Sequence, residues 1–268
     1  MATVTTFAEF MTALNNSEVI DLANDIDGAD YGTITHIYAK ANINGNGHTI
    51  SNVLIYGGDA GFRTNNGAIV KDVYFKNVSC ESTASMFILI AQMSGTTGGF
   101  SNCRFSISID ANNGTLLFIG SPSTAERINL TNCAFDITLS DDVTFNNTVS
   151  IGIFSRCNVV FRNSKIRPSY TLYPIGSNSS NKHVAVVFDG CTLATTTSSF
   201  SAYLQCVEGY IAFRNCTTSL SNISVSGSSN TSLFCNDSSI SASAGTLTTV
   251  TPAQLKSESY LRSIGFLP

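Results

Sequence analysis

Asp141 and Asp142 are the residues whose type and spacing most directly suggest catalysis. Two carboxyl groups that flank a glycosidic bond can act as the acid and the base of its hydrolysis. These two residues lie in the segment 139–143, Leu-Ser-Asp-Asp-Val, where a polar turn between strands is expected. We therefore favour a solvated turn over an acid–base pair, and treat the pair as a weak catalytic candidate.

Cysteine and histidine side chains are the other candidates for chemistry, as metal ligands or as nucleophiles. The eight cysteines include no Cys-x-x-Cys pair, and His36, His48 and His183 stand far apart. Because structural zinc sites usually combine closely spaced pairs of ligands, we predict no metal site and no cofactor. The cysteines recur with the repeat described below, and we expect reduced thiols that behave as small buried hydrophobic groups.

Two tyrosines are the candidate binding residues. Tyr170 and Tyr173 lie in the loop-like segment 168–174, Pro-Ser-Tyr-Thr-Leu-Tyr-Pro, in a chain that has no Trp. Exposed aromatic rings are frequent contacts at binding surfaces. The same rings could instead fill the space beneath a long loop, and the sequence leaves both interpretations open.

The composition excludes several classes of protein. Charged residues make up 12% of the chain and hydrophobic residues 43%, a balance that suits turn-rich β-structure better than helical bundles. The net charge of -4 and the lack of a basic tract argue against nucleic-acid and anionic-membrane partners. No long apolar segment or N-terminal basic-apolar pattern is present, so we expect neither a membrane span nor a signal peptide.

A recurring segment organises the chain. In it, an apolar residue stands two positions before a turn residue, and a small residue and an apolar alternation follow, as in 99–105, Gly-Phe-Ser-Asn-Cys-Arg-Phe. Asn, Asp and Gly suit the turn because they most readily adopt left-handed backbone. The expected turn residues recur every 20 to 31 residues: Asn52, Asp72, Asn102, Asn132, Asn163, Gly190, Asn215 and Asp237. We expect them to form one ladder, with these residues stacked just inside it: Cys103, Cys133, Ser164, Cys191 and Cys216.

Repeats of this length bury their apolar face only by stacking on their neighbours. The sequence therefore predicts an all-β fold, a single-stranded right-handed parallel β-helix with short helices at both ends. Helical spacing of apolar residues in 6–14 indicates the first helix, and Thr251-Pro252-Ala253-Gln254 indicates the start of the second, expected to cover the last coil. We expect one structural domain: a cap with lead-in strands over 1–40, coils over 41–245 and a C-terminal cap over 246–268.

The segment 43–50, Ile-Asn-Gly-Asn-Gly-His-Thr-Ile, together with the turn residues and the terminal helices, resembles the pectin-lyase-like right-handed parallel β-helix superfamily. The Asn-Thr-Asp, Gly-His-Gly and Arg-Ile-Lys motifs of its polygalacturonase-like enzymes have no match here. The short coils and the surface rich in Ser, Thr and Asn look more like non-enzymatic bacteriophage virion proteins and bacterial adhesin repeats. That resemblance implies a homotrimeric tail or capsid appendage, made in the host cytoplasm and located in the virion.

The resulting prediction is a structural or attachment protein of a bacteriophage particle with no catalysis of its own. Its expected partners are further copies of the chain, other virion proteins and a host-surface glycan. Two alternatives remain. One is a tailspike-type polysaccharide depolymerase, a glycosidase or lyase whose carboxylates would converge from different coils or subunits. The other is a bacterial surface adhesin domain.

Overall fold

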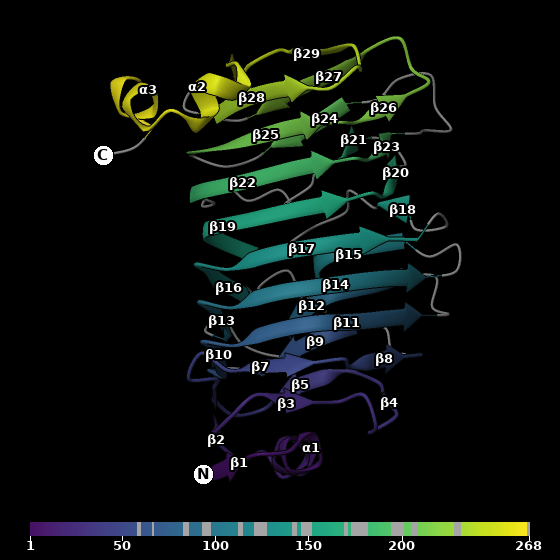
Figure 1. Ribbon diagram of the computed structural model, residues 1–268, viewed down its shortest axis with the longest axis vertical. Coiled ribbons are helices and arrows are strands. Elements are labelled where there is room, and N and C mark those ends of the chain that lie inside the picture. Colours follow the sequence, from purple (N-terminus) through teal and green to yellow (C-terminus); the bar gives the residue numbers. More distant parts are fainter. Residues whose placement is uncertain are drawn as a thin grey trace.

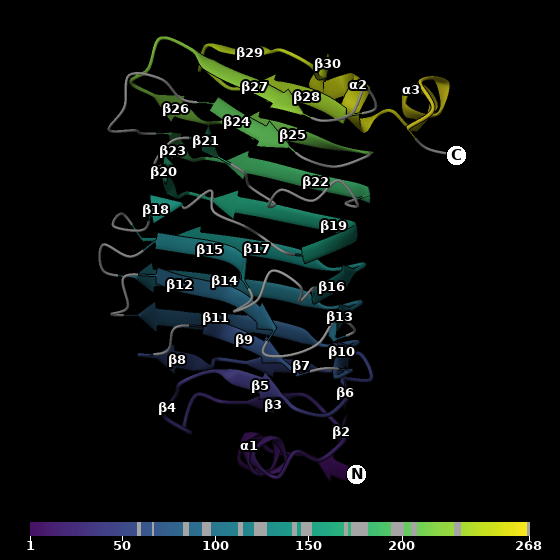
Figure 2. The same cartoon turned by 180° about the vertical axis from the view of Figure 1, so that it is seen from behind.

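Short alternating strands, separated by sharp turns, repeat their path from coil to coil in the computed structural model (Figure 1). Every strand pairing in the described residues is parallel. The coils wind in the right-handed sense, because the strands at the front of Figure 1 run from left to right while the chain rises from the N-terminus, and it returns on the side seen in Figure 2. The predicted right-handed parallel β-helix with short helices at both ends is confirmed. The structure describes residues 1–57, 60–65, 67–82, 86–92, 98–111, 115–120, 128–140, 144–145, 152–168, 171–172, 182–193, 201–204, 208–227 and 232–266.

The strands form sheets that run along the helix axis, and the first and second of these are joined in one 18-stranded sheet. The first sheet contains β1 (Ala2–Val4), β2 (Ile20–Leu22), β6 (Ile43–Asn44), β10 (Ile69–Lys71), β13 (Gly99–Ser101), β16 (Ile128–Thr131) and the start of β19 (Gly152–Arg162). The third sheet contains β5 (Ile37–Ala39), β9 (Ala60–Thr64), β12 (Met86–Gln92), β15 (Thr115–Gly120), β18 (Thr144–Phe145), β20 (Lys165–Pro168), β23 (Thr192–Leu193) and β26 (Thr217–Thr218). A short fourth sheet contains β21 (Thr171–Leu172), β24 (Ser201–Leu204), β27 (Ile223–Gly227) and β29 (Ala242–Ala244).

The second sheet is the longest and lies at the front of Figure 1. It contains β3 (Ile26–Asp27), β7 (Thr49–Ser51), β11 (Tyr74–Ser82), β14 (Arg104–Ala111), β17 (Ala134–Leu139), the rest of β19, β22 (Lys182–Asp189), β25 (Glu208–Arg214), β28 (Ser232–Asp237) and β30 (Thr248–Thr249). Two further strands, β4 (Thr33–Ile34) and β8 (Leu54–Tyr56), extend it beside the second half of β11. The register shifts between Phe75 and Val78 on β11 and between Lys182 and Val184 on β22. On either side of these shifts the strands pair in register, so residues of one type stack in rows.

Aromatic rows fill the interior behind the second sheet. The rings of Phe105 and Phe135 stack with centroids 4.5 Å apart and planes within 5°, and Phe75 stacks on Phe105 at 5.1 Å. A second row, two residues further along the strands, joins Phe188 to Phe161 at 5.3 Å and to Phe213 at 5.2 Å. All of these rings are buried, so the coils from β11 to β25 contribute aromatic groups to a continuous core.

The N-terminal helix closes the first coil, as predicted. Helix α1 (Phe7–Asn15) begins at a capping box in which the Glu9 backbone N–H donates to the Thr6 hydroxyl and the Thr6 backbone N–H donates to the Glu9 carboxylate. Its buried face carries Phe7, Phe10, Met11, Ala13 and Leu14. The helix lies at the bottom of Figure 1, across the open end of the core.

The C-terminal helices pack differently from the prediction. Helix α2 (Pro252–Lys256) starts at Thr251 with the expected capping box, and α3 (Glu258–Ser263) follows. Their apolar side chains, with Phe266, pack against the outer side of the second sheet, at Ala212, Leu233 and Cys235. Ala212 and Cys235 belong to one row of outward positions along the sheet. The row holds Ser106 and Asp136 in earlier coils, and Val187, Ala212 and Cys235 in the last coils. Since that row is apolar, it draws the C-terminal segment to the flank of the last coils.

We predict that Phe135→Ala lowers the free energy of unfolding by about 3 to 5 kcal/mol, because it leaves a cavity in the middle of the aromatic row. Phe135→Leu retains most of the apolar volume and should cost less than about 1.5 kcal/mol. Urea unfolding followed by circular dichroism measures both values. An alanine variant within about 1 kcal/mol of the wild type would show that the row is not a main source of stability.

Candidate functional site

Left-handed backbone marks the corner where the chain enters the second sheet. Asp72, Asn102 and Asn132 have φ of 57°, 54° and 52°, and they occupy equivalent positions on successive coils. The strand register continues this first corner row through Arg156 and His183, whose φ values are 56° and 52°. The Asn102 side-chain N–H donates to the Asp72 carboxylate at 2.6 Å, which joins neighbouring coils.

The remaining turn residues lie at other corners, which corrects the prediction of one ladder. Asn163, Gly190 and Asn215 form a row where the chain leaves the second sheet, and Asn52 stacks with Asn77 at the first coils. Asp237 is no turn residue, because it pairs with Arg214 inside the sheet. Arg156 and His183 were not predicted as turn residues, because arginine rarely adopts left-handed backbone and neither residue type is a usual turn signal.

The cysteines just after the turns stack in two rows, one at each corner of the second sheet. The first corner holds Cys103, Cys133 and Cys157, and the second holds Ser164, Cys191 and Cys216, so the expected single stack is corrected in the same way as the turn residues. Each thiol donates to a backbone carbonyl of a neighbouring coil, as Cys133 Sγ does to Phe100 O at 3.5 Å.

The described cysteines are free thiols and are all buried. Burial without a charged partner raises the pKa of the Cys80 thiol well above its usual range, which favours the unreactive protonated form. The Cys80 thiol therefore acts as a small core group, the role predicted for these cysteines.

Alternating charges follow the outer edge of the second corner. The Arg162 guanidinium contacts the Asp136 carboxylate and the Asp189 carboxylate, each at 2.8 Å, and Arg214 pairs with Asp189 from the next coil. Arg214 and Arg162 hold the pKa of the Asp189 carboxyl below its usual value. These carboxylates and arginines therefore bind one another across coils.

On the coils that precede these ion pairs, the outer side of the second sheet carries rows of polar side chains. Ser79, Ser108 and Thr138 stand in register on β11, β14 and β17, with Ser108 and Thr138 exposed. A parallel row contains Glu81, Asp110 and Ser140, in which the Ser140 hydroxyl donates to the Asp110 carboxylate at 2.9 Å. We call these two rows the hydroxyl face.

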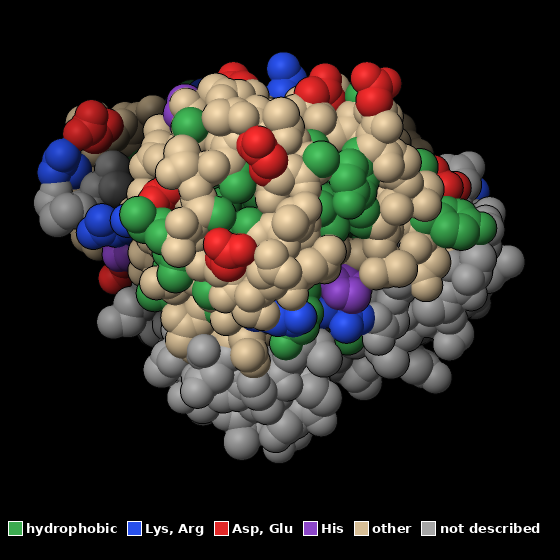
Figure 3. Space-filling view, turned by 90° about the horizontal axis from the view of Figure 1, so that it is seen from below, with side chains coloured by type: hydrophobic (Ala, Val, Ile, Leu, Met, Phe, Trp, Pro, Cys, Tyr) green, Lys and Arg blue, Asp and Glu red, His purple; other side chains and the backbone are tan. Residues whose placement is uncertain are grey.

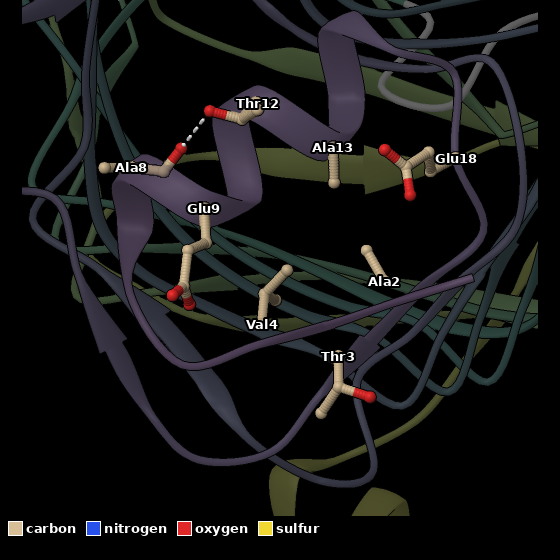
Figure 4. A pocket seen from close by; sticks show the side chains of 8 residues that line it. All are labelled: Ala2, Thr3, Val4, Ala8, Glu9, Thr12, Ala13 and Glu18. Atoms are coloured by element: carbon tan, nitrogen blue, oxygen red, sulfur yellow. Dashed lines mark hydrogen bonds between the residues drawn. The ribbon is translucent and has the colours of Figure 1, made fainter.

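The N-terminal end carries a groove between β1 and α1, shown in Figure 4. Its volume is about 390 Å³. The side chains of Ala2 and Val4 face the helix across the groove, while Glu9 and Glu18 stand at its two ends. The remaining lining residues are Thr3, Ala8, Thr12 and Ala13.

The end that bears the groove is acidic. Residues 1–39 hold six of the 18 acidic residues and none of the 14 Lys and Arg residues. Figure 3 shows acidic side chains spread over this end of the molecule. Hydrogen bonds from Thr5 and Thr6 lower the pKa of the Glu9 carboxyl, so this groove residue is negatively charged at neutral pH.

The predicted catalytic and binding residues cannot be placed in either region. Asp141, Asp142, Tyr170 and Tyr173 lie outside the described residues. Within the described part, no three His, Cys, Asp or Glu side chains group as ligands for a metal ion. None of the helices in that part is long and apolar enough to cross a bilayer.

Residues 1–105 match the family described as "Putative pectate lyase-like adhesive domain". The match includes the N-terminal helix, the groove and the coils up to the start of β14. No curated protein and no solved structure matches the chain. The family match and the stacked coils together support a pectin-lyase-like parallel β-helix.

We predict that Asn102→Ala is less stable than Asn102→Gly by about 1 to 2 kcal/mol. Both changes remove the hydrogen bond to Asp72, but only alanine has a Cβ that opposes the left-handed backbone. Urea unfolding of the two variants measures the difference. Equal stabilities would mean that this corner relaxes to another conformation without cost.

We predict that Asp189→Asn destabilises the fold by about 1 kcal/mol at pH 7 and by less as the pH falls below about 4. The pKa of Asp189 is lowered in the folded state, so its stabilisation is complete above about pH 4 and is lost as the pH falls through the folded pKa. Unfolding by urea at several pH values tests this, with the exposed Asp30→Asn as control. A difference between Asp189→Asn and wild type that stays the same from pH 7 to pH 2 would contradict the ion-pair origin.

Proposed function

We propose that this protein is an attachment module that binds a cell-surface glycan through the hydroxyl face. The observation that supports this most strongly is the combination of a rigid β-helix with the match of its first 105 residues to an adhesive-domain family. The matched residues include the groove-bearing end and the strands β7 and β11 of the second sheet. Adhesion is therefore the function that the fold and the family description both favour.

The geometry of the hydroxyl face suits a glycan. Neighbouring strands of a sheet lie about 4.8 Å apart, so Ser79, Ser108 and Thr138 repeat a hydroxyl at that spacing. The carboxylates of Glu81 and Asp110 add acceptors for sugar hydroxyls alongside this row. Since the strands are held in register on both sides, the groups are positioned before a ligand arrives, which reduces the entropy lost on binding.

The carrier that we propose is a bacteriophage particle, on which the module would be a homotrimeric appendage in contact with other virion proteins. The surface of a bacterial cell is the alternative carrier, and the adhesive-domain description favours it. Light scattering of the purified protein addresses the assembly. A trimeric mass agrees with the appendage, whereas a monomer at working concentration contradicts it.

A polysaccharide depolymerase of tailspike type remains the enzymatic alternative. Its carboxylates would have to come from several coils or from adjacent copies of the chain. In the described second sheet, Asp136 and Asp189 are already paired with Arg162 and Arg214. Those ion pairs favour a structural role for this group of carboxylates over acid–base work.

We predict that the double variant Ser108→Arg, Thr138→Arg binds target cells at least about tenfold more weakly than the wild type, because two long charged side chains cover the hydroxyl row. Fluorescently labelled protein and flow cytometry measure the binding. The matched control is Ser224→Arg, an exposed outward position on β27 of the fourth sheet.

The outcomes distinguish the hypotheses. Weak binding by the double variant with normal binding by the control supports the hydroxyl face as the adhesion surface. Equal binding by all three proteins contradicts it. Release of reducing sugars or unsaturated products from the host polysaccharide would replace attachment by the depolymerase function.

A further inference from the structure

The first strand leaves one backbone edge free at the bottom of the β-helix. The Ala2 N–H donates to Val19 O at 2.7 Å, and Val4 O accepts from the Ala23 N–H at 3.0 Å. Residues 2 and 4 thus direct their backbone groups toward β2, and strand alternation directs the N–H and C=O of Thr3 to the opposite side. An exposed edge of this kind is a template for another strand.

The groove beside this edge has room for an extended segment. Ala2 and Val4 on the strand and Ala13 on the helix line its middle, and two of these three side chains are small. The Thr12 hydroxyl is turned back to Ala8 O at 2.9 Å, so it does not occupy the groove. Strand addition in other proteins also combines backbone hydrogen bonds with a few side-chain pockets.

The charges around the groove indicate the charge of the segment that it would bind. Glu9 and Glu18 stand at opposite ends of it, and Asp21 is the register partner of Thr3 on the adjoining strand. No Lys or Arg occurs in the first 39 residues. A segment with basic residues on both sides of a small residue therefore complements the groove in shape and in charge.

We propose that an extended, basic segment of a partner protein adds as a strand to the free edge of β1, with its basic side chains at Glu9 and Glu18. A second copy of this chain fits less well, because two acidic ends would face each other. The chain's own C-terminal helices lie at the opposite end of the β-helix (Figure 1). This inference does not depend on the hydroxyl face or on the nature of the carrier.

The test uses the peptide acetyl-Lys-Val-Ala-Val-Lys-amide as a probe, in which the central alanine faces the small lining residues. NMR titration of the whole chain should show shifts at the amides of residues 2–4. The acidic analogue acetyl-Glu-Val-Ala-Val-Glu-amide should not bind. Absence of binding by the basic peptide up to about 5 mM would overturn the proposal, as would equal binding by the acidic one.

Two variants separate the backbone contact from the side chain. Thr3→Pro removes the outward N–H but none of the hydrogen bonds to β2, and should weaken binding at least about tenfold. Thr3→Ala keeps the N–H and should bind within about twofold of the wild type. Circular dichroism and thermal unfolding establish that both variants fold. Equal affinity of Thr3→Pro and Thr3→Ala would overturn strand addition.

The charge contribution is tested with Glu9→Gln and Glu18→Gln. Glutamine can still accept the capping hydrogen bonds, so Glu9→Gln retains the start of α1. Each change should weaken binding of the basic peptide by about threefold, and less at high salt. Unchanged affinity in both variants would overturn the basic partner. If the wild-type chain forms a dimer that Thr3→Pro dissociates, a second copy of the chain is the occupant, and the proposal of a basic partner is overturned.

Discussion

The register of hydrogen bonds between successive coils is the constraint on which the rest of this structure depends. A coil of a parallel β-helix bonds to the coils on either side, so each must retrace the path of its neighbours at the strands. Left-handed residues such as Asn102 and Asn132 permit the sharp bend at the same place each time. Segments between the strands are free of this constraint, which is why the interval between equivalent positions varies.

Pairing in register has the same effect on both sides of the second sheet. Inside, it stacks Phe75, Phe105 and Phe135 and places thiols above one another next to the corners. Outside, it aligns charges of opposite sign, as in the contacts of Asp189 with Arg162 and Arg214. A surface built in this way is rigid and repetitive, and it offers a partner groups at fixed intervals rather than a deep cavity.

The two ends of the β-helix are covered in different ways. Helix α1 closes the core at the first coil but leaves the outer edge of β1 exposed beside an acidic groove. At the other end, the C-terminal segment adds β30 to the second sheet and then packs its helices on an apolar flank. The N-terminal end therefore retains backbone groups of β1 for another strand.

Much of the fold could be predicted from the sequence because its determinants are local. The apolar alternation, the Asn and Gly turn residues and the capping residues Thr6 and Thr251 each act within a few positions of the chain, so they are visible in one dimension. The hydroxyl face and the groove at β1 left no comparable signal. Their residues are ordinary Ser, Thr, Ala and Glu, brought together from separate coils or from a strand and a helix.

Tertiary structure alone decided which repeats are equivalent. Asn132 and Asn163 look alike in sequence, yet they bend the chain at opposite ends of the second sheet, and Arg156 takes the position expected for Asn163. A local preference determines that a residue can form a turn, but pairing with the neighbouring coil determines which turn it forms. By itself, the sequence determined the kind of coil and its caps; the alignment of the coils, and the surfaces that follow from it, required the hydrogen bonds between them.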